Sequence, residues 1–393
     1  MVDLMRRQAE GSTDAVELAA FVDQLGLVDH HVHGAFRENG SRERFENALN
    51  EGSTDPLPGF VSGFDSQLGF AVRRWCSPLL DLEPFAEPDE YWARREELGE
   101  AEVNRRFLTS AGVSDWVIDT GYAAGSYGLT EMAGVTGGRI HEIVRLETIA
   151  ESLIAGGPNG YAERFRSALR TAVSNGAIGT KSVIAYRTGF DVELSRPSEI
   201  TVAAAASAWS SSIDSGSAPR LVDPTLLVFG LFAAVDARLP IQFHVGFGDR
   251  DLDLHRTNPM LLLPFLRDAD VAAIPVLLLH CYPFEREAGY LAQAFGNVYL
   301  DVGLSLNFLG ARGAELVARS YELAPFAKVL YSSDAWGPAE LHYLGARLWR
   351  NAITRVFGDW VDRGEWSLAD AKRIAALSAN GNARRLYTLT PSN

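Results

Sequence analysis

Three of the eight histidines in the 393-residue sequence lie together in the stretch VDHHVHG, residues 28–34. Side chains two residues apart on a strand point to the same face, so His31 and His33 would share one face and His30 would take the other. Neutral imidazoles on one face are ligands that zinc, manganese and iron accept. The spacing therefore favours a metal site, although a polar turn with a chance cluster is the simpler alternative.

Three further polar residues each end a later apolar run. His244 ends the run in IQFHVG, His280 ends the run in VLLLHCY, and Asp334 ends the run in KVLYSSD. A single histidine at the end of a strand usually makes an ordinary local hydrogen bond. Four histidines and an aspartate that share this placement indicate one common site with metal-binding chemistry.

The apolar runs that could form strands number eight, and segments with helical periodicity lie between most of them. The runs span residues 25–33, 114–122, 140–148, 176–186, 239–246, 274–282, 297–303 and 327–335. Strands that alternate with helices indicate βαβ units and a parallel sheet. Eight such units predict the α/β class and a closed (β/α)8 TIM barrel, whose strands all end at one mouth.

Two regions exceed a minimal barrel. Residues 1–24 predict a short N-terminal helix, with Ser12-Thr13-Asp14 offering its cap. Residues 35–113 separate the first two strands by far more than a crossover needs, and they contain helical stretches. This insertion follows a strand, so it would lie at the mouth as a lid or an oligomer contact, or as decoration alone. We expect residues 1–393 to form a single barrel domain.

Composition excludes several classes of protein. The formal net charge of -14 argues against general binding to nucleic acid or to an anionic membrane. Cys76 and Cys281 are the two cysteines, so no disulfide framework is expected. We see no secretory signal and no membrane span, since charged residues and a proline interrupt the most apolar stretch. We expect a soluble cytoplasmic protein that acts on a small molecule, with a homodimer as the commonest oligomer.

The order of the polar residues resembles that of the amidohydrolase superfamily. VDHHVH is similar to the Asp-x-His-x-His signature that opens this superfamily, and the later residues fall where it places ligands on its fifth, sixth and eighth strands. TKSVIAYRTGFD and LLHCYPFEREAGYLAQAFGNVYLDVGLS resemble the amidohydrolase-2 subgroup. In particular, they look like the amidohydrolase domain of FluG- and nodulin-glutamine-synthetase-like proteins. The resemblance covers nearly the whole chain.

The resemblance implies a divalent ion, first of all Zn²⁺, with Mn²⁺ or Fe²⁺ as alternatives. His31, His33 and His244 would hold it, and Asp334 would be a ligand or would hydrogen-bond to its water. A bound metal lowers the pKa of coordinated water from 15.7 toward roughly 7. Asp334 would then take the proton of that water and later return it to the leaving group.

Two further residues bear on the number of metal ions. His280 would polarise the substrate carbonyl, or would join His244 as a ligand of a second ion. Lys181 lies within the fourth apolar run. If it were carboxylated it would bridge two ions, and otherwise it would be an ordinary lysine that needs an acidic partner or the substrate.

Residues that could contact the substrate follow other runs. Tyr186 and Arg187 come directly after the fourth run, and Arg187 could grip a carboxylate in a bidentate fork or pair with an acidic neighbour. Glu147, near the end of the third run, is a candidate pocket acid. Trp336 could form an aromatic wall or pack under the last helix.

The remaining residues of these types are expected outside the site. His30 would face the helical layer, and His141 would lie at the opposite end of the barrel. His342 is expected on a helix. Cys281 is expected to be a buried, unreactive side chain.

We therefore expect a metal-dependent hydrolase that cleaves an amide-type C–N bond in a small carboxylate-bearing substrate, such as a γ-glutamyl compound. The alternative is a metal-dependent, non-oxidative decarboxylase of an aromatic or related carboxylic acid. A binding protein on a degenerate barrel is a third interpretation, which the complete set of five polar residues disfavours.

Overall fold

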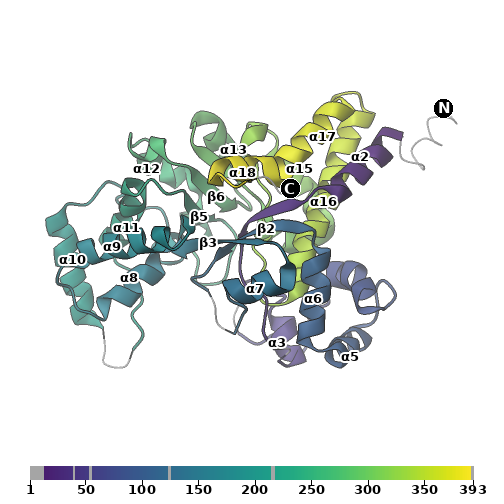
Figure 1. The fold of residues 1–393 in the computed structure, drawn as a ribbon, viewed down its shortest axis with the longest axis horizontal. Coiled ribbons are helices and arrows are strands. Elements are labelled where there is room, and N and C mark those ends of the chain that lie inside the picture. Colours follow the sequence, from purple (N-terminus) through teal and green to yellow (C-terminus); the bar gives the residue numbers. More distant parts are fainter. Residues whose placement is uncertain (1–12, 39, 53–54, 123–124, 214–216, 391–393) are drawn as a thin grey trace.

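The computed structural model describes residues 13–38, 40–52, 55–122, 125–213 and 217–390. Within these residues, one parallel sheet contains seven strands, and each strand pairs with the next along the chain (Figure 1). The strands are β1 (Leu27–Val32), β2 (Val113–Asp119), β3 (Arg139–Arg145), β4 (Ala177–Ser182), β5 (Ile241–Val245), β6 (Val276–His280) and β7 (Val298–Leu300). The sheet curls as a half-barrel in a TIM-barrel-like fold. The predicted α/β class and the parallel order of the strands are therefore confirmed.

The eighth predicted strand, residues 327–335, is not a regular strand. An isolated bridge joins Val329 to Leu300. The backbone N–H of Leu330 donates to Leu300 at 2.9 Å, and that of Asp334 donates to His31 at 3.0 Å. Asp334 has a φ of 48°, in the left-handed region, which interrupts an extended ladder. The prediction of eight regular strands is therefore not confirmed, although this segment hydrogen-bonds to both edge strands.

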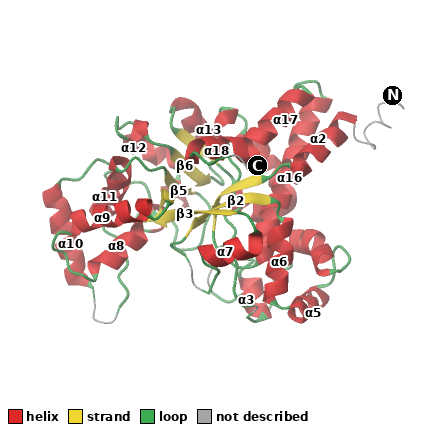
Figure 2. Cartoon of the chain, in the orientation of Figure 1, coloured by secondary structure: helices red, strands yellow, loops and turns green. Residues whose placement is uncertain are grey.

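Helices surround the sheet (Figure 2). Outside the segment between β1 and β2 they are α2 (Thr13–Gln24), α7 (Leu129–Thr136), α8 (Leu146–Ile154), α9 (Tyr161–Ser174), α10 (Glu199–Ser212), α11 (Pro224–Asp236), α12 (Leu263–Leu266), α13 (Glu285–Ala294), α14 (Gly303–Leu309), α15 (Gly313–Ser320), α16 (Ala339–Asp362), α17 (Leu368–Ala376) and α18 (Asn382–Tyr387). Short 3-10 turns span Ile184–Tyr186, Leu254–Thr257, Pro259–Leu262, Val271–Ala273, Gly310–Arg312 and Phe326–Lys328, and a π-turn spans Leu377–Gly381. Helix α11 begins with Asp223 as its cap and Pro224 in its first turn, as helix starts favour.

The segment between β1 and β2 is largely helical. It contains α3 (Arg42–Asn47), α4 (Gln67–Ala71), a π-turn (Val72–Cys76), a 3-10 turn (Ser77–Leu80), α5 (Pro88–Leu98) and α6 (Glu100–Ser110). The buried guanidinium of Arg95 lies 2.8 Å from Glu100 and 2.8 Å from Glu340 of α16. This ion-pair network ties the insertion to the helical layer, on the side of the sheet opposite α8–α11 (Figure 1).

Alternate strand residues pack into two different hydrophobic clusters. Val117 of β2 and Leu277 of β6 belong to a small cluster with Tyr387 of α18. Their neighbours Ile118 and Leu278 belong to the large cluster that includes the surrounding helices. Because successive strand residues point to opposite faces, the small cluster lies inside the curl of the sheet and the large one outside it.

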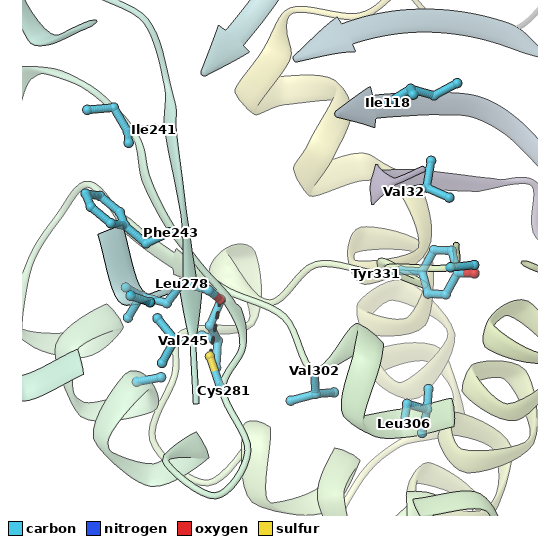
Figure 3. Close-up of a cluster of buried hydrophobic side chains, with 14 of the residues drawn as sticks. Val32, Ile118, Ile241, Phe243, Val245, Leu278, Cys281, Val302, Leu306 and Tyr331 are labelled. Atoms are coloured by element: carbon cyan, nitrogen blue, oxygen red, sulfur yellow. Dashed lines mark hydrogen bonds between the residues drawn. The ribbon is translucent and has the colours of Figure 1, made fainter. Parts of the chain in front are cut away.

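Cys281 lies in the large outer cluster, as predicted. Figure 3 shows its sulfur among buried hydrophobic side chains that include Val245 and Leu278. The Sγ–H of Cys281 donates to the carbonyl of Leu278 at 3.2 Å, and burial raises the pKa of the thiol well above its ordinary value. Among the described residues, none of the helices combines the length and apolar character required to cross a membrane.

Candidate active site

Three imidazoles meet one carboxylate where the strands end. The Nε2 atom of His31 lies 2.9 Å from Oδ1 of Asp334, and that of His33 lies 3.4 Å from the same oxygen. The Nε2 atom of His280 lies 3.4 Å from Oδ2 of Asp334. His31 lies in β1, His33 directly follows it, His280 ends β6 and Asp334 lies in the segment at 327–335; all three imidazoles are buried. The structure thus brings together four of the five residues expected to form one site.

Hydrogen bonds orient His31 of β1 and His33, which directly follows β1. Nδ1 of His31 lies 2.7 Å from the side-chain oxygen of Gln242, whose amide nitrogen donates in turn to the carbonyl of His30 and to Tyr387. Nδ1 of His33 lies 3.1 Å from the carbonyl of Asp119. Both acceptors require a proton on Nδ1, which leaves a lone pair on each Nε2 atom. The two rings are therefore prepared to act as ligands.

His280 has an unusual backbone and an unsatisfied ring. Its φ is 70°, and its backbone N–H donates to Oδ1 of Asp301 at 3.0 Å. Its ring is buried, and neither nitrogen has a hydrogen-bond partner among the described residues. Buried polar atoms without hydrogen-bond partners are rare. We therefore expect the two ring nitrogens of His280 to bind a ligand that the protein itself does not supply.

Two overlapping groups of residues have the spacing of metal ligands. The donor atoms of His31, His280 and Asp334 lie within 4.8 Å of one another, as do those of His31, His33 and Asp119. Both oxygens of Asp119 are already hydrogen-bonded, because Arg145 donates to Oδ2 at 2.6 Å and the backbone of Gly121 donates to Oδ1 at 2.8 Å. Asp334 faces the imidazoles. The donor set around Asp334 therefore fits a divalent ion best.

His244 lies beside this cluster and belongs to neither group of ligand atoms. Its ring centroid is 4.7 Å from that of His280 and 4.5 Å from that of Tyr186. The hydroxyl of Tyr186 lies 3.1 Å from Nε2 of His244. This geometry does not reproduce the predicted ligand set of His31, His33 and His244, because the ring of His244 leans toward the chain that follows β4.

Burial and neighbouring groups together set the protonation states of His31, His280 and Asp334. Burial and the nearby Lys181 ammonium lower the pKa of His31 to about 3. Burial lowers the pKa of His280 to about 4. Burial alone would raise the pKa of Asp334, but the imidazoles of His280 and His31 hold it well below its usual value. At neutral pH the imidazoles of His31 and His280 are therefore neutral and the carboxylate of Asp334 is ionised, which is the state that metal ligands require.

Lys181 is buried directly beside the cluster. Its Nζ atom lies 3.3 Å from Nε2 of His31. Burial lowers the pKa of Lys181 to about 8, although the carboxylates of Asp334 and Asp119 oppose that change. Its position matches the one expected from the fourth apolar run.

A pocket of about 800 Å³ adjoins the cluster. Its lining combines the ends of the strands with the insertion, and includes His33, Ser41, Glu43, Arg44, Asn47, Glu51, Tyr122, Arg145, Lys181, Tyr186, Arg187, Arg220, His244, Asp249, Asp251, Asp334 and Trp336. Trp336 packs edge-on against Phe36 and Tyr122, each at 5.1 Å between ring centroids. Trp336 is therefore part of the aromatic wall that the sequence predicts, and the insertion contributes directly to the pocket.

Two predicted substrate residues differ in their placement. Arg187 lines the pocket and donates to Glu151 at 3.0 Å, so it pairs with an acidic neighbour, while its contact with a substrate carboxylate stays a prediction. Glu147 is not among the residues that line the pocket. Its carboxylate accepts hydrogen bonds from Ser182 at 2.7 Å and from the backbone of Val183 at 3.0 Å. Strand β3 ends at Arg145, earlier than expected, so Glu147 falls in the first turn of α8 and supports the end of β4 instead.

The other histidines lie outside the cluster. Nε2 of His30 lies 2.9 Å from Oδ2 of Asp301, and its ring is 6.4 Å from Tyr387. His30, which was expected to face the helical layer, thus lies between Asp301, directly after β7, and Tyr387 of α18. His342 lies on α16 as predicted. His141 lies 3.1 Å from Asp115 at the starts of β2 and β3, the opposite end of the sheet.

Sequence reasoning missed several residues that shape the site. Two of them, Asp119 and Asp301, lie at the ends of strands, and Gln242 lies two residues before His244 on the same face of β5. A search for polar residues at the ends of apolar runs, which identified His244, could have identified these residues as well. The sequence pattern indicated less clearly that Arg145 and Glu51 line the pocket. The path of the insertion, which brings Glu51 to the pocket, cannot be read from periodicity.

Comparisons with known proteins agree with this geometry. Residues 215–389 match the family model described as amidohydrolase. The protein FluG of Emericella nidulans is 32% identical over 278 residues, which cover 63% of this chain and 32% of FluG. The chain therefore spans about a third of the length of this curated relative.

Solved structures share the fold along almost the entire chain. A protein of Lactobacillus casei ATCC 334, provisionally described as a metal-dependent hydrolase, superposes with a TM-score of 0.82 at 29% identity and covers 94% of this chain and 97% of its own. A uronate isomerase of Bacillus halodurans C-125 has a TM-score of 0.62 at 15% identity and covers 96% of each chain, which shows likeness of fold alone. The chain is thus similar to the amidohydrolase family over residues 215–389, and to FluG over 278 residues.

Proposed function

We propose that the protein is a metal-dependent hydrolase that cleaves an amide-type C–N bond in a small, carboxylate-bearing substrate. The observation that carries this proposal is the buried cluster of His31, His280 and Asp334, whose donor atoms lie within 4.8 Å of one another beside the pocket. The pocket volume of about 800 Å³ suits a small molecule.

His31, His33, His280 and Asp334 would hold the ion. Zn²⁺ is the first candidate, and Mn²⁺ and Fe²⁺ accept the same ligands. When bound, such an ion activates water as a nucleophile at neutral pH and polarises a carbonyl oxygen. Asp334 is ionised, so it can accept the proton of the attacking water and later protonate the leaving nitrogen. If a second ion binds, His244 and a carboxylated Lys181 are its proposed ligands.

The pocket residues suggest how the substrate is held. Arg187 would bind a carboxylate through its free donors while Glu151 fixes its position. Tyr186 and Trp336 would form the walls around the scissile bond. A γ-glutamyl amide or a similar compound has the charge and size that this arrangement accepts.

Non-oxidative decarboxylation is the second candidate. The observation that favours it is the buried ammonium of Lys181, 3.3 Å from His31, which could hold a carboxylate at the cluster itself. In that reaction Asp334 would help to protonate the carbon that loses carbon dioxide. Release of carbon dioxide, rather than of ammonia or an amine, would identify this reaction.

Further features of the protein are proposals from its sequence and family. They are zinc as the resident ion, a homodimer, a cytoplasmic location, the absence of nucleic-acid and membrane partners, and a single barrel domain in which residues 35–113 act as a lid.

The test begins with the metal content of purified protein. The wild type should hold about one ion per chain or more, and the His31→Ala/His33→Ala double variant should fold and hold little. His141→Ala removes a histidine paired with Asp115 at the far end of the sheet, so it should keep its metal. A panel of γ-glutamyl amides and N-acyl amino acids should release ammonia or amine with wild type only when the metal is present. Full occupancy in the folded double variant would refute the site.

A further inference from the structure

Arg145 is a largely buried cation at the wall of the pocket. It is the last residue of β3, and its side chain is 15% exposed. Its Nε and Nη2 atoms donate to the same oxygen of Asp119, at 3.2 Å and 2.6 Å. Asp119 is fully buried, so this ion pair fixes the guanidinium in one position.

The pairing with Asp119 uses only part of the guanidinium. An arginine side chain carries five N–H donors in a planar fork. Nη1 makes no hydrogen bond to any residue that the structure describes, and Arg145 lines the pocket. Arg145 therefore presents unused, fixed donors to whatever enters the pocket.

Gly121 makes room for this arrangement. A Cβ atom at Gly121 would lie 2.5 Å from Cβ, 2.6 Å from Nε and 2.7 Å from Cδ of Arg145. Such distances are too short for ordinary contacts, and Asp119 prevents the arginine from moving aside. The backbone N–H of Gly121 also donates to Oδ1 of Asp119 at 2.8 Å. The turn after β2 is thus built around the guanidinium.

Arg145 also lies close to the histidine cluster. Asp119, its partner, has a carboxylate oxygen within 4.8 Å of the ligand atoms of His31 and His33. In the pairing of β3 with β4, Arg145 is opposite Lys181. The carboxylate of Asp119 therefore lies beside both Arg145 and the histidine pair.

We infer that Arg145 binds a carboxylate of the substrate, and that Asp119 and Gly121 position it for this role. The inference rests on the proposed hydrolase function and narrows its substrate class. The substrate would carry its anionic group a few bonds from the bond that is cleaved, and that group would meet a rigid arginine rather than a mobile one. A preorganised, charge-assisted contact of this kind gives both affinity and orientation.

The test uses glutarate as the probe and uncharged glutaramide as its matched control. Calorimetric titrations would compare wild type, Arg145→Gln and Gly121→Ala, each with and without Zn²⁺. Arg220→Gln is the control for charge, because Arg220 also lines the pocket but is largely exposed beside Asp251. We expect glutarate to bind about tenfold or more weakly to both test variants. Arg220→Gln should change its affinity less than about threefold, and glutaramide should bind weakly to all.

The use of both Arg145→Gln and Gly121→Ala distinguishes a loss of the arginine contact from a general loss of the fold. Arg145→Gln leaves Asp119 without its cation, whereas Gly121→Ala keeps every charge and only displaces the guanidinium. Unchanged glutarate affinity in a folded Gly121→Ala or Arg145→Gln variant would overturn the inference, as would equal binding of glutarate and glutaramide to wild type. The metal content and turnover of wild type report on the proposed function separately, so the two failures can be told apart.

Discussion

The Nζ atom of Lys181 lies 3.3 Å from Nε2 of His31, inside the buried cluster. The ammonium helps to lower the pKa of His31 to about 3, so the imidazole stays neutral. The pKa of Lys181 itself is lowered to about 8, chiefly by burial. Near neutral pH the lysine is therefore still mostly charged, and it repels any cation that His31 binds.

Metal binding should accordingly release a proton from Lys181. Titration of metal-free protein with Zn²⁺ at pH 7, in buffers of different ionisation enthalpy, should show close to one more proton released by wild type than by Lys181→Met. The difference should vanish near pH 9, above the pKa of the lysine. Equal proton release by both proteins at pH 7 would contradict this expectation. Loss of metal from Lys181→Met, with bicarbonate-dependent binding in wild type, would instead indicate a carboxylated lysine.

Asp334→Asn should abolish most turnover while the fold survives. The amide keeps the shape of the side chain but cannot accept a proton, and general base catalysis is typically worth ~10²–10⁴-fold. Metal content, thermal unfolding and steady-state rate should be measured on one preparation. Asp249→Asn, which changes a pocket carboxylate outside the cluster, is the control. Near-normal turnover in metal-loaded Asp334→Asn would mean that another group moves the proton.

Asp301→Asn should weaken metal binding, although Asp301 is not one of the proposed ligands of the ion. The carboxylate of Asp301 accepts hydrogen bonds from the backbone of His280 and Gly303, and it pairs with the ring of His30. Loss of such supporting contacts typically costs 10- to 100-fold in metal affinity. Competition with a chelator would measure this. Asp115→Asn, a buried carboxylate at the far end of the sheet, should lower thermal stability but leave the affinity for metal unchanged.

Gly248→Ala should close the pocket beside His244. A Cβ atom there would lie 2.1 Å from the hydroxyl of Tyr186 and 2.8 Å from Nε2 of His244. We expect weaker substrate binding, seen as a raised KM, with metal content unchanged. At Gly59 the same methyl group would meet no atom of the described residues within 4 Å, so Gly59→Ala should behave as wild type. The same KM for both variants would show that the pocket tolerates the shift.

Acid should destabilise the protein partly through His342. Burial lowers its pKa to about 4, against 6.5 in an unfolded chain. The unfolded state therefore takes up the proton first, and this contribution to stability is lost as pH falls from about 6.5 to about 4. Urea unfolding at pH 7 and pH 5 should show a loss that is ~2 kcal/mol smaller in His342→Gln. Identical losses in both proteins would mean that His342 is not held neutral.

The strand-end rule predicted the site better than it predicted the strands. His31, His33, His280 and Asp334 converge because the carboxyl ends of parallel strands meet, which periodicity alone could anticipate. The same reasoning could not foresee that Asp334 has a left-handed backbone, or that β3 ends early enough to place Glu147 in a helix. These outcomes depend on local turns and on contacts between distant segments.

The path of the insertion and the ion pairs could not be predicted from the sequence for another reason. The pairing of Arg145 with Asp119 joins two charged residues that look unrelated in the sequence, and a neighbouring glycine decides whether it fits. Charge partners depend on the three-dimensional path of the chain. The amino-acid composition and the hydrophobic periodicity of the sequence do not determine that path.

The hydrogen bonds between β1 and the segment that carries Asp334 join residues about 300 positions apart. During translation, at 5–20 residues per second, β1 would wait roughly 15 to 60 seconds for this partner. Until then one edge of β1 has unpaired backbone groups, and edges of this kind invite association with other chains. The histidine pair is also made long before its carboxylate. The complete ligand set can therefore capture an ion only after residue 334 has left the ribosome, which makes metal loading one of the last events in the maturation of the protein.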